Sequence, residues 1–346
     1  AKGEYEVIPG TEAFIILDNF KSAEPVYKNK EATLHDIGDG VLCLEFHSKM
    51  NAIGSGTLSA INKSIEIAEN EGWKGLVIGN DAPNFSAGAN LAMMLMLAIE
   101  QEFDELNMVI SYFQKTVMRL RYSSVPVVIA PHGLTLGGGC EMTLHSDAAV
   151  ASAETYIGLV EAGVGLIPGG GGTKEFVVRT SDSFYAGDPQ LPTLIERFQT
   201  IATAKVATSG HEAFEIGVMN HEKDEVVVNG ARVITEAKRK VIELHNDGYV
   251  QKPQRDDILV LGRTALGALY SGVEAFGISG YASEHDMLIG RKLAYVMAGG
   301  DLTQPTKVTE QYLLNLEREA FLSLLGQRKT LERIQHMLKT GKPLRN

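Results

Sequence analysis

The chain has 346 residues, of which 44% are hydrophobic and 22% are charged, a composition typical of a soluble globular protein with one large domain or two. Its formal net charge of −11 argues against a general nucleic-acid or anionic-membrane binder, because such proteins need a basic face. Two cysteines are too few for a disulfide framework, and the sequence contains neither a signal peptide nor a run of about 18 apolar residues. We therefore expect a cytoplasmic protein without a membrane span.

The first half of the chain alternates strands and helices. Residues 1–27 have no sustained period and are interpreted as a linker or N-terminal arm. Two segments with alternating apolar residues flank Gly38-Asp39-Gly40, which predicts a β-hairpin. Apolar runs and helical spacing predict strands at 75–79, 126–130 and 147–151 and helices at 55–71, 91–100 and 103–122. This alternation indicates an α/β fold for residues 28–228.

The second half of the chain is mostly helical. Short helices are expected at 174–179, 191–207 and 211–220, followed by a last strand at 225–228. Beyond that strand, apolar residues at helical spacing predict helices at 231–246, 258–275, 282–298, 306–325 and 328–339. We therefore predict a helical C-terminal region at 229–346.

Two glycine-rich or small-residue loops are candidates for a binding site. Residues 137–139 are three consecutive glycines, and 84–90 is a loop of small residues. Glycine lets a backbone approach a ligand closely and present bare N–H groups. If the two loops meet, one N–H from each would bind a carbonyl oxygen as an oxyanion hole. The alternative is that both are merely tight turns, since glycines punctuate loops everywhere.

Glu141 and Glu161 are the candidate acids beside these loops. A single Glu is usually a solvated surface group. Glu141, however, follows Gly139-Cys140, and Glu161 stands within Leu159-Val160-Glu161-Ala162-Gly163. Burial in such apolar surroundings would raise the pKa of either carboxyl group and make it a plausible general acid.

Two other patterns resemble ligand sites and are set aside. The run at 169–174 reads Gly-Gly-Gly-Gly-Thr-Lys, whereas a phosphate loop needs Gly-Lys-Ser/Thr directly after a strand. Glu284-His285-Asp286 has no metal-ligand spacing and is interpreted as the start of a helix, so we predict no metal site.

Four ordered motifs resemble those of the enoyl-CoA hydratase/isomerase (crotonase) superfamily over roughly residues 28–225. They are Met50-Asn51-Ala52-Ile53, Phe85-Ser86-Ala87-Gly88-Ala89-Asn90, Gly137-Gly138-Gly139-Cys140-Glu141, and the segment from Glu161-Ala162-Gly163 to Gly169-Gly170-Gly171-Gly172-Thr173. The resemblance implies a spiral of ββα units that binds an acyl-CoA thioester, with coenzyme A present only as part of the substrate.

The same resemblance implies roles for individual residues. The oxyanion donors would be the N–H groups of Ala89 and Gly138, and Glu141 and Glu161 would add water to a 2-enoyl-CoA. Glu161 is the preferred proton donor to C2, but the sequence leaves open which of the two acids is the base. The N–H of Gly169 would help to hold the water. Further substrate contacts are expected at Asn51, Ala52, Ser86, Ala87, Gly88, Asn90 and Gly137.

Two departures from a minimal hydratase bear on the whole protein. Asn90 stands where many relatives have Asp, and the chain from Lys174 onward follows a different pattern. The long C-terminal region resembles bacterial bifunctional proteins in which a 3-hydroxyacyl-CoA dehydrogenase precedes the hydratase. We therefore expect such a domain N-terminal to this chain. Hydratases of the family often form trimers or dimers of trimers, so a homo-oligomer is an expectation that the sequence leaves open.

Three functions remain open at this point. Hydration of 2-trans-enoyl-CoA in fatty-acid β-oxidation is favoured, because both acids of a hydratase are present. The first alternative is a Δ3-Δ2-enoyl-CoA isomerase. The second is a non-catalytic assembly module that binds acyl-CoA and docks a partner through its helical C-terminal region.

Overall fold

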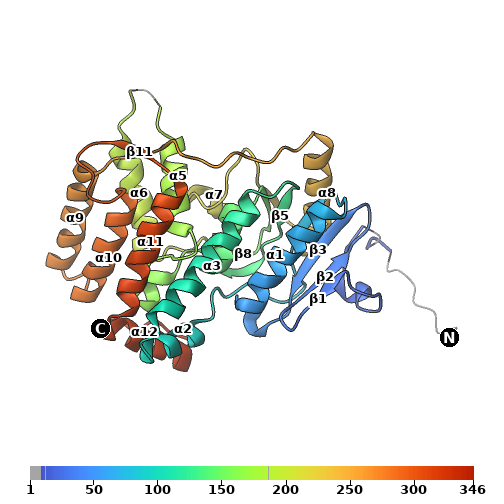
Figure 1. Ribbon diagram of the computed structural model, residues 1–346, viewed down its shortest axis with the longest axis horizontal. Coiled ribbons are helices and arrows are strands. Elements are labelled where there is room, and N and C mark those ends of the chain that lie inside the picture. The colour runs from blue at the N-terminus through green and yellow to red at the C-terminus, as the bar shows by residue number, and fades with distance from the viewer. Residues whose placement is uncertain (1–8, 12, 186) are drawn as a thin grey trace.

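The structure is a computed structural model that describes residues 9–11, 13–185 and 187–346 (Figure 1). The expected N-terminal arm therefore lies partly outside the described residues. Within it, a short 3₁₀ helix η1 (Leu17–Phe20) buries Leu17, whose N–H donates to Asp81 at 2.7 Å. No helix in the described ranges is both long enough and apolar enough to span a bilayer.

The main sheet of the fold has seven strands and is mixed. Its order is β1-β2-β3-β4-β5-β7-β9, so that the strands follow one another across the sheet in chain order. The first three strands pair antiparallel, as the predicted hairpin requires, and the remaining pairs are parallel. The strands are β1 (Tyr27–Lys28), β2 (Ala32–Asp36), β3 (Val41–Phe46), β4 (Gly75–Ile78), β5 (Val127–Ile129), β7 (Ala148–Ser152) and β9 (Glu225–Val227).

A second, two-stranded sheet makes the fold a spiral. Strand β6 (Gly133–Leu136) follows β5, and β8 (Thr155–Gly158) follows β7. These two pair in parallel with each other instead of joining the main sheet. Each turn of the chain thus adds one strand to each sheet, with helix α4 (Gly138–His145) between the turns. This arrangement confirms the predicted α/β spiral of ββα units.

Helices cover both faces of the main sheet, which explains its continuous apolar strands. On β3, Leu42 and Leu44 pack toward one face and Val41 and Cys43 toward the other. Helices α1 (Ser55–Asn70) and α3 (Phe103–Arg121) cover the first face, and α8 (Val233–Asn246) covers the second. Helix α8 belongs to the predicted C-terminal region yet packs on the sheet, while the boundary near residue 228 stays a prediction.

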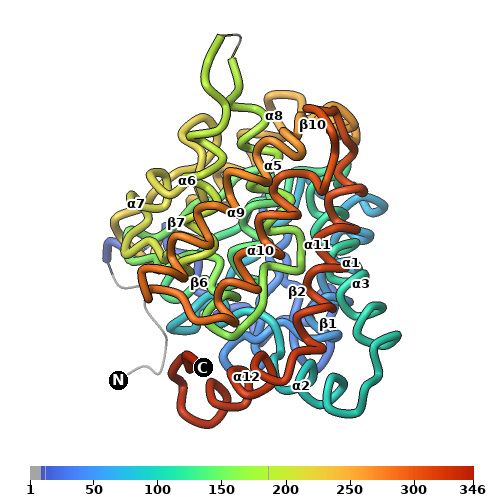
Figure 2. The backbone as a smooth tube through the Cα atoms, turned by 90° about the vertical axis from the view of Figure 1, so that its left-hand side faces the viewer, coloured from blue at the N-terminus to red at the C-terminus, as the bar shows by residue number. Residues whose placement is uncertain are grey.

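The other C-terminal helices form a layer beside the spiral (Figures 1 and 2). They share a large apolar core with the end of the spiral. The helices of this layer and those that lead to it are α2 (Leu91–Ile99), α5 (Gly172–Asp182), α6 (Gln190–Ala202), α7 (Glu212–Glu215), α9 (Arg263–Ile278), α10 (Glu284–Met297), α11 (Glu310–Leu325) and α12 (Arg328–Thr340). The predicted helical C-terminal extension of the fold is thereby confirmed.

Two of the predicted C-terminal helices were too long. Each begins instead with a three-residue strand, β10 (Ile258–Val260) or β11 (Thr306–Val308), and the two strands pair antiparallel. Gly262, with a φ of +65°, ends the first strand and turns the chain into α9. The predicted helix at 191–207 likewise ends at Ala202, shortly before Ala204 takes a positive φ of 50°. The pairing of β10 with β11 joins segments far apart in sequence, which helical spacing alone does not reveal.

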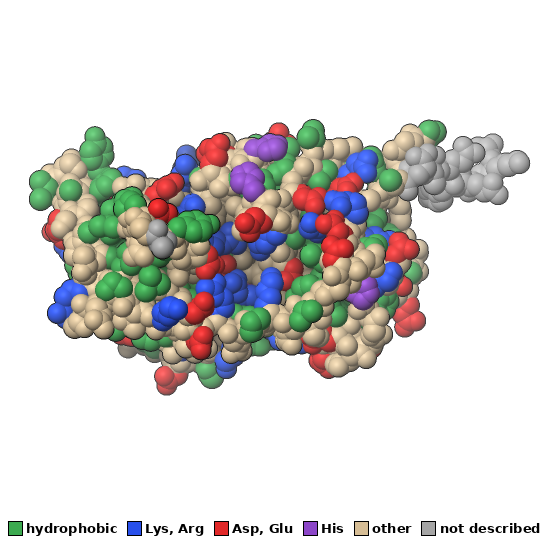
Figure 3. All heavy atoms as spheres, turned by 90° about the horizontal axis from the view of Figure 1, so that it is seen from above, with side chains coloured by type: hydrophobic (Ala, Val, Ile, Leu, Met, Phe, Trp, Pro, Cys, Tyr) green, Lys and Arg blue, Asp and Glu red, His purple; other side chains and the backbone are tan. Residues whose placement is uncertain are grey.

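The surface carries mixed charge. Figure 3 shows one face, with Lys and Arg side chains gathered near its middle among Asp and Glu. A cleft of about 410 Å³ on the molecule is lined mainly by apolar residues of α6, α9 and α10, and a wider one of about 930 Å³ is lined by Arg119, Arg255 and Arg318. The first two of these arginines pair with Glu69 and Asp182, so the charge of the wider cleft is largely balanced.

Candidate active site

The two loops that the sequence singled out lie against each other. The Ser86 N–H donates to the Leu134 carbonyl at 3.0 Å, and the Leu136 N–H donates to the Ser86 carbonyl at 3.0 Å. The loop at 84–90 thus runs alongside β6, which ends at the glycine turn 137–139. A Cβ on Gly88 would lie 2.9 Å from the Leu136 oxygen and 3.4 Å from the Gly138 nitrogen, so the approach requires glycine.

Within these turns, the two N–H groups expected to bind an oxyanion, those of Ala89 and Gly138, are among those without an acceptor in the described residues. Ala89 lies opposite Ile53 in a parallel β-bridge. The two hydrogen bonds of this bridge run from the Ile53 N–H to the Gly88 carbonyl and from the Asn90 N–H to the Ile53 carbonyl. The N–H of Ala89 therefore takes no part in that bridge. Gly138 is the first residue of α4, and an N–H in the first turn of a helix has no intrahelical acceptor. The loop at 84–90 and the turn at 137–139 therefore meet, as the predicted oxyanion hole requires.

Other expected substrate contacts hold the loops together. The Ser86 hydroxyl donates to the Asn51 carbonyl at 2.8 Å and accepts from the Gly88 N–H at 3.1 Å. The Asn51 side chain donates to the Asn84 carbonyl at 3.1 Å. Asn90 caps α2, since its side chain accepts from the Met93 N–H at 3.2 Å. Backbone N–H groups of Ala52 and Ala87 bond within the adjoining 49–51 turn, to Lys49 and Met50.

Glu141 is a buried carboxylate held by backbone. Only 4% of the residue is exposed, and it lies in the first turn of α4. Its Oε1 accepts from the N–H groups of Gly170 and Gly172 at 2.8 and 2.9 Å. Burial raises the pKa of Glu141, while the two N–H groups oppose that rise because they stabilise the ionised form. This carboxylate is suited to accept a proton.

Glu161 is the contrasting acid. It opens the 3₁₀ helix η3 (Glu161–Val164), and its Oε2 is buried without a hydrogen-bond partner in the described part of the chain. Its Oε1 points at the glycine turn, where a Cβ on Gly137 would lie 3.0 Å away. Burial, and after it repulsion from Glu141, raise the pKa of Glu161 well above its ordinary range. The residue is therefore suited to carry a proton at neutral pH.

A third buried acid, Glu317 on α11, was not predicted. Its Oε1 accepts from the Gly171 N–H at 2.6 Å, and its Oε2 accepts from the Lys174 N–H at 2.8 Å. Burial, with added repulsion from Glu141, raises the pKa of Glu317. One signal could have found it, because Glu317 stands on the apolar face of α11, in line with Leu313 and Phe321.

The four glycines at 169–172 are explained by crowding from all sides. A Cβ on Gly169 would lie 2.5 Å from Phe321, and a Cβ on Gly170 would lie 2.4 Å from Phe113. Gly171 has a φ of +105°, which side chains rarely adopt. The carbonyl of Gly169 accepts from Gln114 at 3.0 Å. The expected contact of the Gly169 N–H with water remains a prediction.

Comparison with known proteins identifies the family. Residues 36–183 match the family model described as enoyl-CoA hydratase/isomerase. The whole chain aligns with a Bacillus subtilis (strain 168) protein named probable 3-hydroxyacyl-CoA dehydrogenase at 46% identity. The alignment covers 43% of that protein's length. Residues 36–183 of this chain belong to the enoyl-CoA hydratase/isomerase (crotonase) superfamily. The chain is also 26% identical over 340 residues to a putative fatty acid oxidation complex trifunctional enzyme of Rickettsia prowazekii (strain Madrid E), of which it covers 42%. The chain spans less than half the length of these relatives.

Solved structures agree on the crotonase fold. A carnitinyl-CoA dehydratase from Mycobacterium thermoresistibile superposes with a TM-score of 0.63 at 16% identity, covering 91% of each chain. An enoyl-CoA hydratase from Bacillus halodurans gives a TM-score of 0.56 at 17% identity, covering 87% of this chain and 98% of the other. At these identities the likeness concerns the fold, which here includes both the spiral and part of the helical layer.

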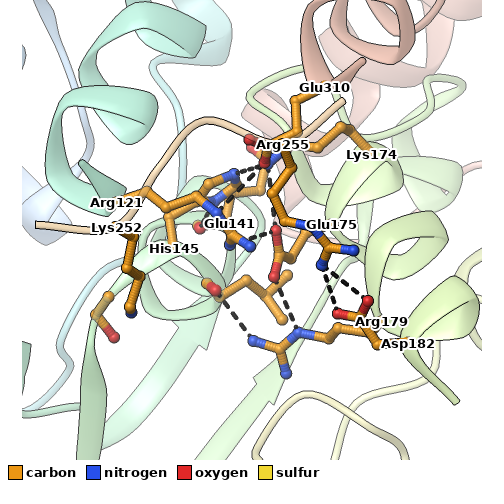
Figure 4. Close-up of polar contacts among 12 residues, drawn as sticks. Arg121, Glu141, His145, Lys174, Glu175, Arg179, Asp182, Lys252, Arg255 and Glu310 are labelled. Carbon is orange, nitrogen blue, oxygen red and sulfur yellow. Dashed lines mark hydrogen bonds and ion pairs between the residues drawn. The ribbon is translucent and has the colours of Figure 1, made fainter. Parts of the chain in front are cut away.

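Behind the acids of this crotonase domain lies a cluster of paired charges (Figure 4). The fully buried Lys174 places its Nζ 3.0 Å from Glu310 and 3.2 Å from Glu175. Arg121 also pairs with both carboxylates. Burial opposes ionisation of Glu175, but attraction from Arg121, Lys174 and other cations holds its pKa well below the ordinary range. These charges join α3, α5 and α11.

His145 links the ion-pair cluster to Glu141. Its Nδ1 lies 2.6 Å from the Glu141 carbonyl oxygen, which only accepts, so Nδ1 carries the hydrogen. Its Nε2, 2.8 Å from the Lys174 Nζ, then accepts from that ammonium group. Burial, and next the charge of Lys174, lower the pKa of His145 well below its ordinary range. A neutral His145 thus fixes the end of α4 without adding charge.

The Glu284-His285-Asp286 run, set aside above as a ligand site, has a structural role. Ser283 and Asp286 form a reciprocal capping box at the start of α10, as expected for a helix N-terminus. His285 bonds Thr330 at 2.9 Å, and Thr330 donates to the Gly165 carbonyl at 2.9 Å. These contacts tie α10 and α12 to the turn that follows Glu161.

Proposed function

We propose that this crotonase-family chain hydrates 2-trans-enoyl-CoA thioesters to 3-hydroxyacyl-CoA in fatty-acid β-oxidation. The observation that carries the proposal is the pair of buried carboxyl groups in unequal surroundings, Glu141 held by two N–H groups and Glu161 with an unpartnered oxygen. Family membership supports an acyl-CoA substrate, and the names of the relatives support a setting in fatty-acid oxidation.

In the proposed reaction, the N–H groups of Ala89 and Gly138 receive the thioester carbonyl oxygen. Negative charge develops on this oxygen when water attacks C3, because the electron pair of the C2–C3 double bond moves toward the thioester. Preorganised donors stabilise such an oxyanion by about 3 kcal/mol each. The addition of water to the double bond is redox-neutral and needs no metal or redox cofactor.

The two acids divide the proton transfers. The water oxygen bonds to C3 while its proton passes to Glu141, the acid that backbone donors keep closer to ionisation. Glu161 gives its proton to C2 and becomes ionised. One molecule of water is thereby added, and a proton transfer from Glu141 to Glu161 restores the starting state. Coupled acids titrate jointly, so the protons belong to the pair.

The product suggests the neighbouring activity in the full-length protein. A 3-hydroxyacyl-CoA is the substrate of a 3-hydroxyacyl-CoA dehydrogenase, which is the name given to the Bacillus subtilis relative. We propose a dehydrogenase domain N-terminal to this chain. NAD-dependent oxidation of the product by the full-length protein, and not by this chain alone, tests that arrangement.

The function is tested by following the loss of enoyl-thioester absorbance with 2-enoyl-CoA of short and long acyl chains. We expect Glu141→Gln and Glu161→Gln each to lower kcat by about 10²–10⁴-fold with substrate binding retained, since each removes one proton transfer. Glu215→Gln on the exposed side of α7 is the matched control and should keep wild-type kcat.

Each outcome selects among functions. Turnover that survives in both variants excludes the acid pair. A folded wild-type chain that binds acyl-CoA but hydrates no chain length excludes a hydratase and supports an assembly module. Conversion of 3-enoyl-CoA that Glu141→Gln spares, with hydration lost, supports a separate isomerase activity.

A further inference from the structure

One turn of the backbone is held between two carboxylates from different parts of the chain. The N–H groups of Gly170 and Gly172 point to Glu141 on α4. Those of Gly171 and Lys174 point the other way, to Glu317 on α11. The N–H groups of the turn at 169–174 are therefore divided between two carboxylates that lie on opposite sides of it. A shift of the turn toward either carboxylate changes its bonds to the other.

Among the described residues, no Lys or Arg side chain forms an ion pair with Glu317. Gln114 donates to its Oε1 at 3.4 Å. Glu317 is fully buried. Burying a carboxylate without a counter-charge costs free energy that an apolar residue would not. Leu313 and Phe321 already dock α11 into the core, so a carboxylate is not needed for packing.

We propose that Glu317 is a positioning residue for Glu141: it fixes the 169–174 turn so that the turn's N–H groups hold Glu141 in its reactive orientation. The effect of Glu317 on catalysis rests on the proposed hydration, whereas its effect on the orientation of Glu141 does not. Both N–H bonds of the turn go to Oε1 of Glu141, which leaves Oε2 as the oxygen that the turn does not hold. That oxygen is the one we assign to the attacking water.

Charge provides a second link between the two acids. The charged groups facing Glu141 are Glu161 on η3, Glu317 on α11 and Lys174 on α5. Repulsion from Glu141 raises the pKa of Glu317, whereas the charge of Lys174 opposes the rise of both pKa values. The helical C-terminal region is thereby linked to an acid on the spiral both through the 169–174 turn and through charge.

The decisive variant is Glu317→Gln. A Gln oxygen still accepts the Gly171 N–H, but its NH₂ group would face the Lys174 N–H, donor against donor. The turn should therefore shift while the fold persists. Glu319→Gln is the matched control, because Glu319 is exposed on the same helix.

Nuclear magnetic resonance tests the positioning without reference to turnover. The amide signals of Gly170 and Gly172 and the carboxyl titration of Glu141 are compared in the full chain, with Glu141→Gln for assignment. In Glu317→Gln we expect both amide signals to move and the titration of Glu141 to shift with them, because these two N–H groups stabilise its ionised form. Signals and titration that coincide with those of the wild type overturn the proposal.

Kinetics distinguish this proposal from the hydratase assignment. If the wild type hydrates enoyl-CoA, Glu317→Gln should lower kcat by about 10–100-fold, change KM by less than about threefold and shift the acidic limb of the kcat profile. An unchanged kcat and profile overturn the positioning. A wild type without hydratase activity rejects the proposed function, while the amide signals and the titration still decide whether Glu317 positions Glu141.

Discussion

Two buried groups of charged residues lie side by side in this protein and differ in how their charges are satisfied. Around the glycine turns at 137–139 and 169–174, Glu141 and Glu317 accept mainly from backbone N–H groups, and Oε2 of Glu161 has no partner among the described residues. In the ion-pair cluster behind it, Lys174 and Arg121 pair with Glu175 and Glu310. Paired charges hold helices together, whereas carboxyl groups without counter-ions remain ready to exchange protons.

The difference is visible in the directions of the pKa shifts. Burial dominates at the glycine turn and raises the pKa of Glu141, Glu161 and Glu317. In the ion-pair cluster, cations overcome the same burial and lower the pKa of Glu175. Lys174 belongs to both groups, because its N–H binds Glu317 while its ammonium group binds Glu310. Breaking one group should therefore affect stability, and breaking the other should affect catalysis.

Removing Lys174 gives the largest expected loss of stability. Lys174→Met takes one partner from a fully buried ion-pair network, which we expect to cost about 3–5 kcal/mol of unfolding free energy. The exposed pair of Lys63 and Glu66 offers the control, since Lys63→Met should cost less than about 1 kcal/mol. Urea denaturation measures both. A Lys174→Met midpoint equal to that of Lys63→Met would contradict a structural role for the cluster.

The sequence predicted the part of the site that is local in the chain. The loops at 84–90 and 137–139 and the acids Glu141 and Glu161 belong to short motifs, and strands β4, β5 and β7 are short apolar runs. Glu317 was missed because its bond to Gly171 spans 146 residues. The pairing of β10 with β11 was missed for the same reason, since each strand is only three residues long and its partner is distant.

The two groups should respond oppositely to pH. For the three acids at the glycine turn, the folded pKa is raised above the ordinary 4.5, so the folded chain binds protons more tightly than the unfolded chain. Their contribution to stability is fully present below about pH 4.5 and is lost as pH rises, toward about 7 for Glu141 and about 8 for Glu317. Glu175 has the opposite sign, and its contribution is lost as pH falls below 4.5.

Unfolding free energies of the wild type and Glu161→Gln between about pH 5 and pH 9 test this expectation. The wild type should lose a few kcal/mol over that range, and the variant should lose less because one raised carboxyl group is gone. Parallel curves would show that Glu161 titrates alike in the folded and unfolded chain, and its assignment as the proton donor would then be wrong.

The smallest expected effect comes from the turn that lies between Glu141 and Glu317. Gly171 has a φ of +105°, and a Cβ there would lie 2.8 Å from the His145 ring. Gly171→Ala should cost about 1–3 kcal/mol in backbone strain. It should also lower kcat, because any relief of strain moves the N–H groups that hold Glu141 and Glu317.

The matched control for that change is Gly267→Ala on α9, where a Cβ meets nothing within 4 Å and φ is not positive. An alanine there should stabilise the helix by about 0.4–1 kcal/mol. Thermal unfolding and kcat are measured for both variants. If Gly171→Ala is as stable and as active as Gly267→Ala, the turn is not held rigidly, and the two buried carboxylates on either side of it are independent of each other.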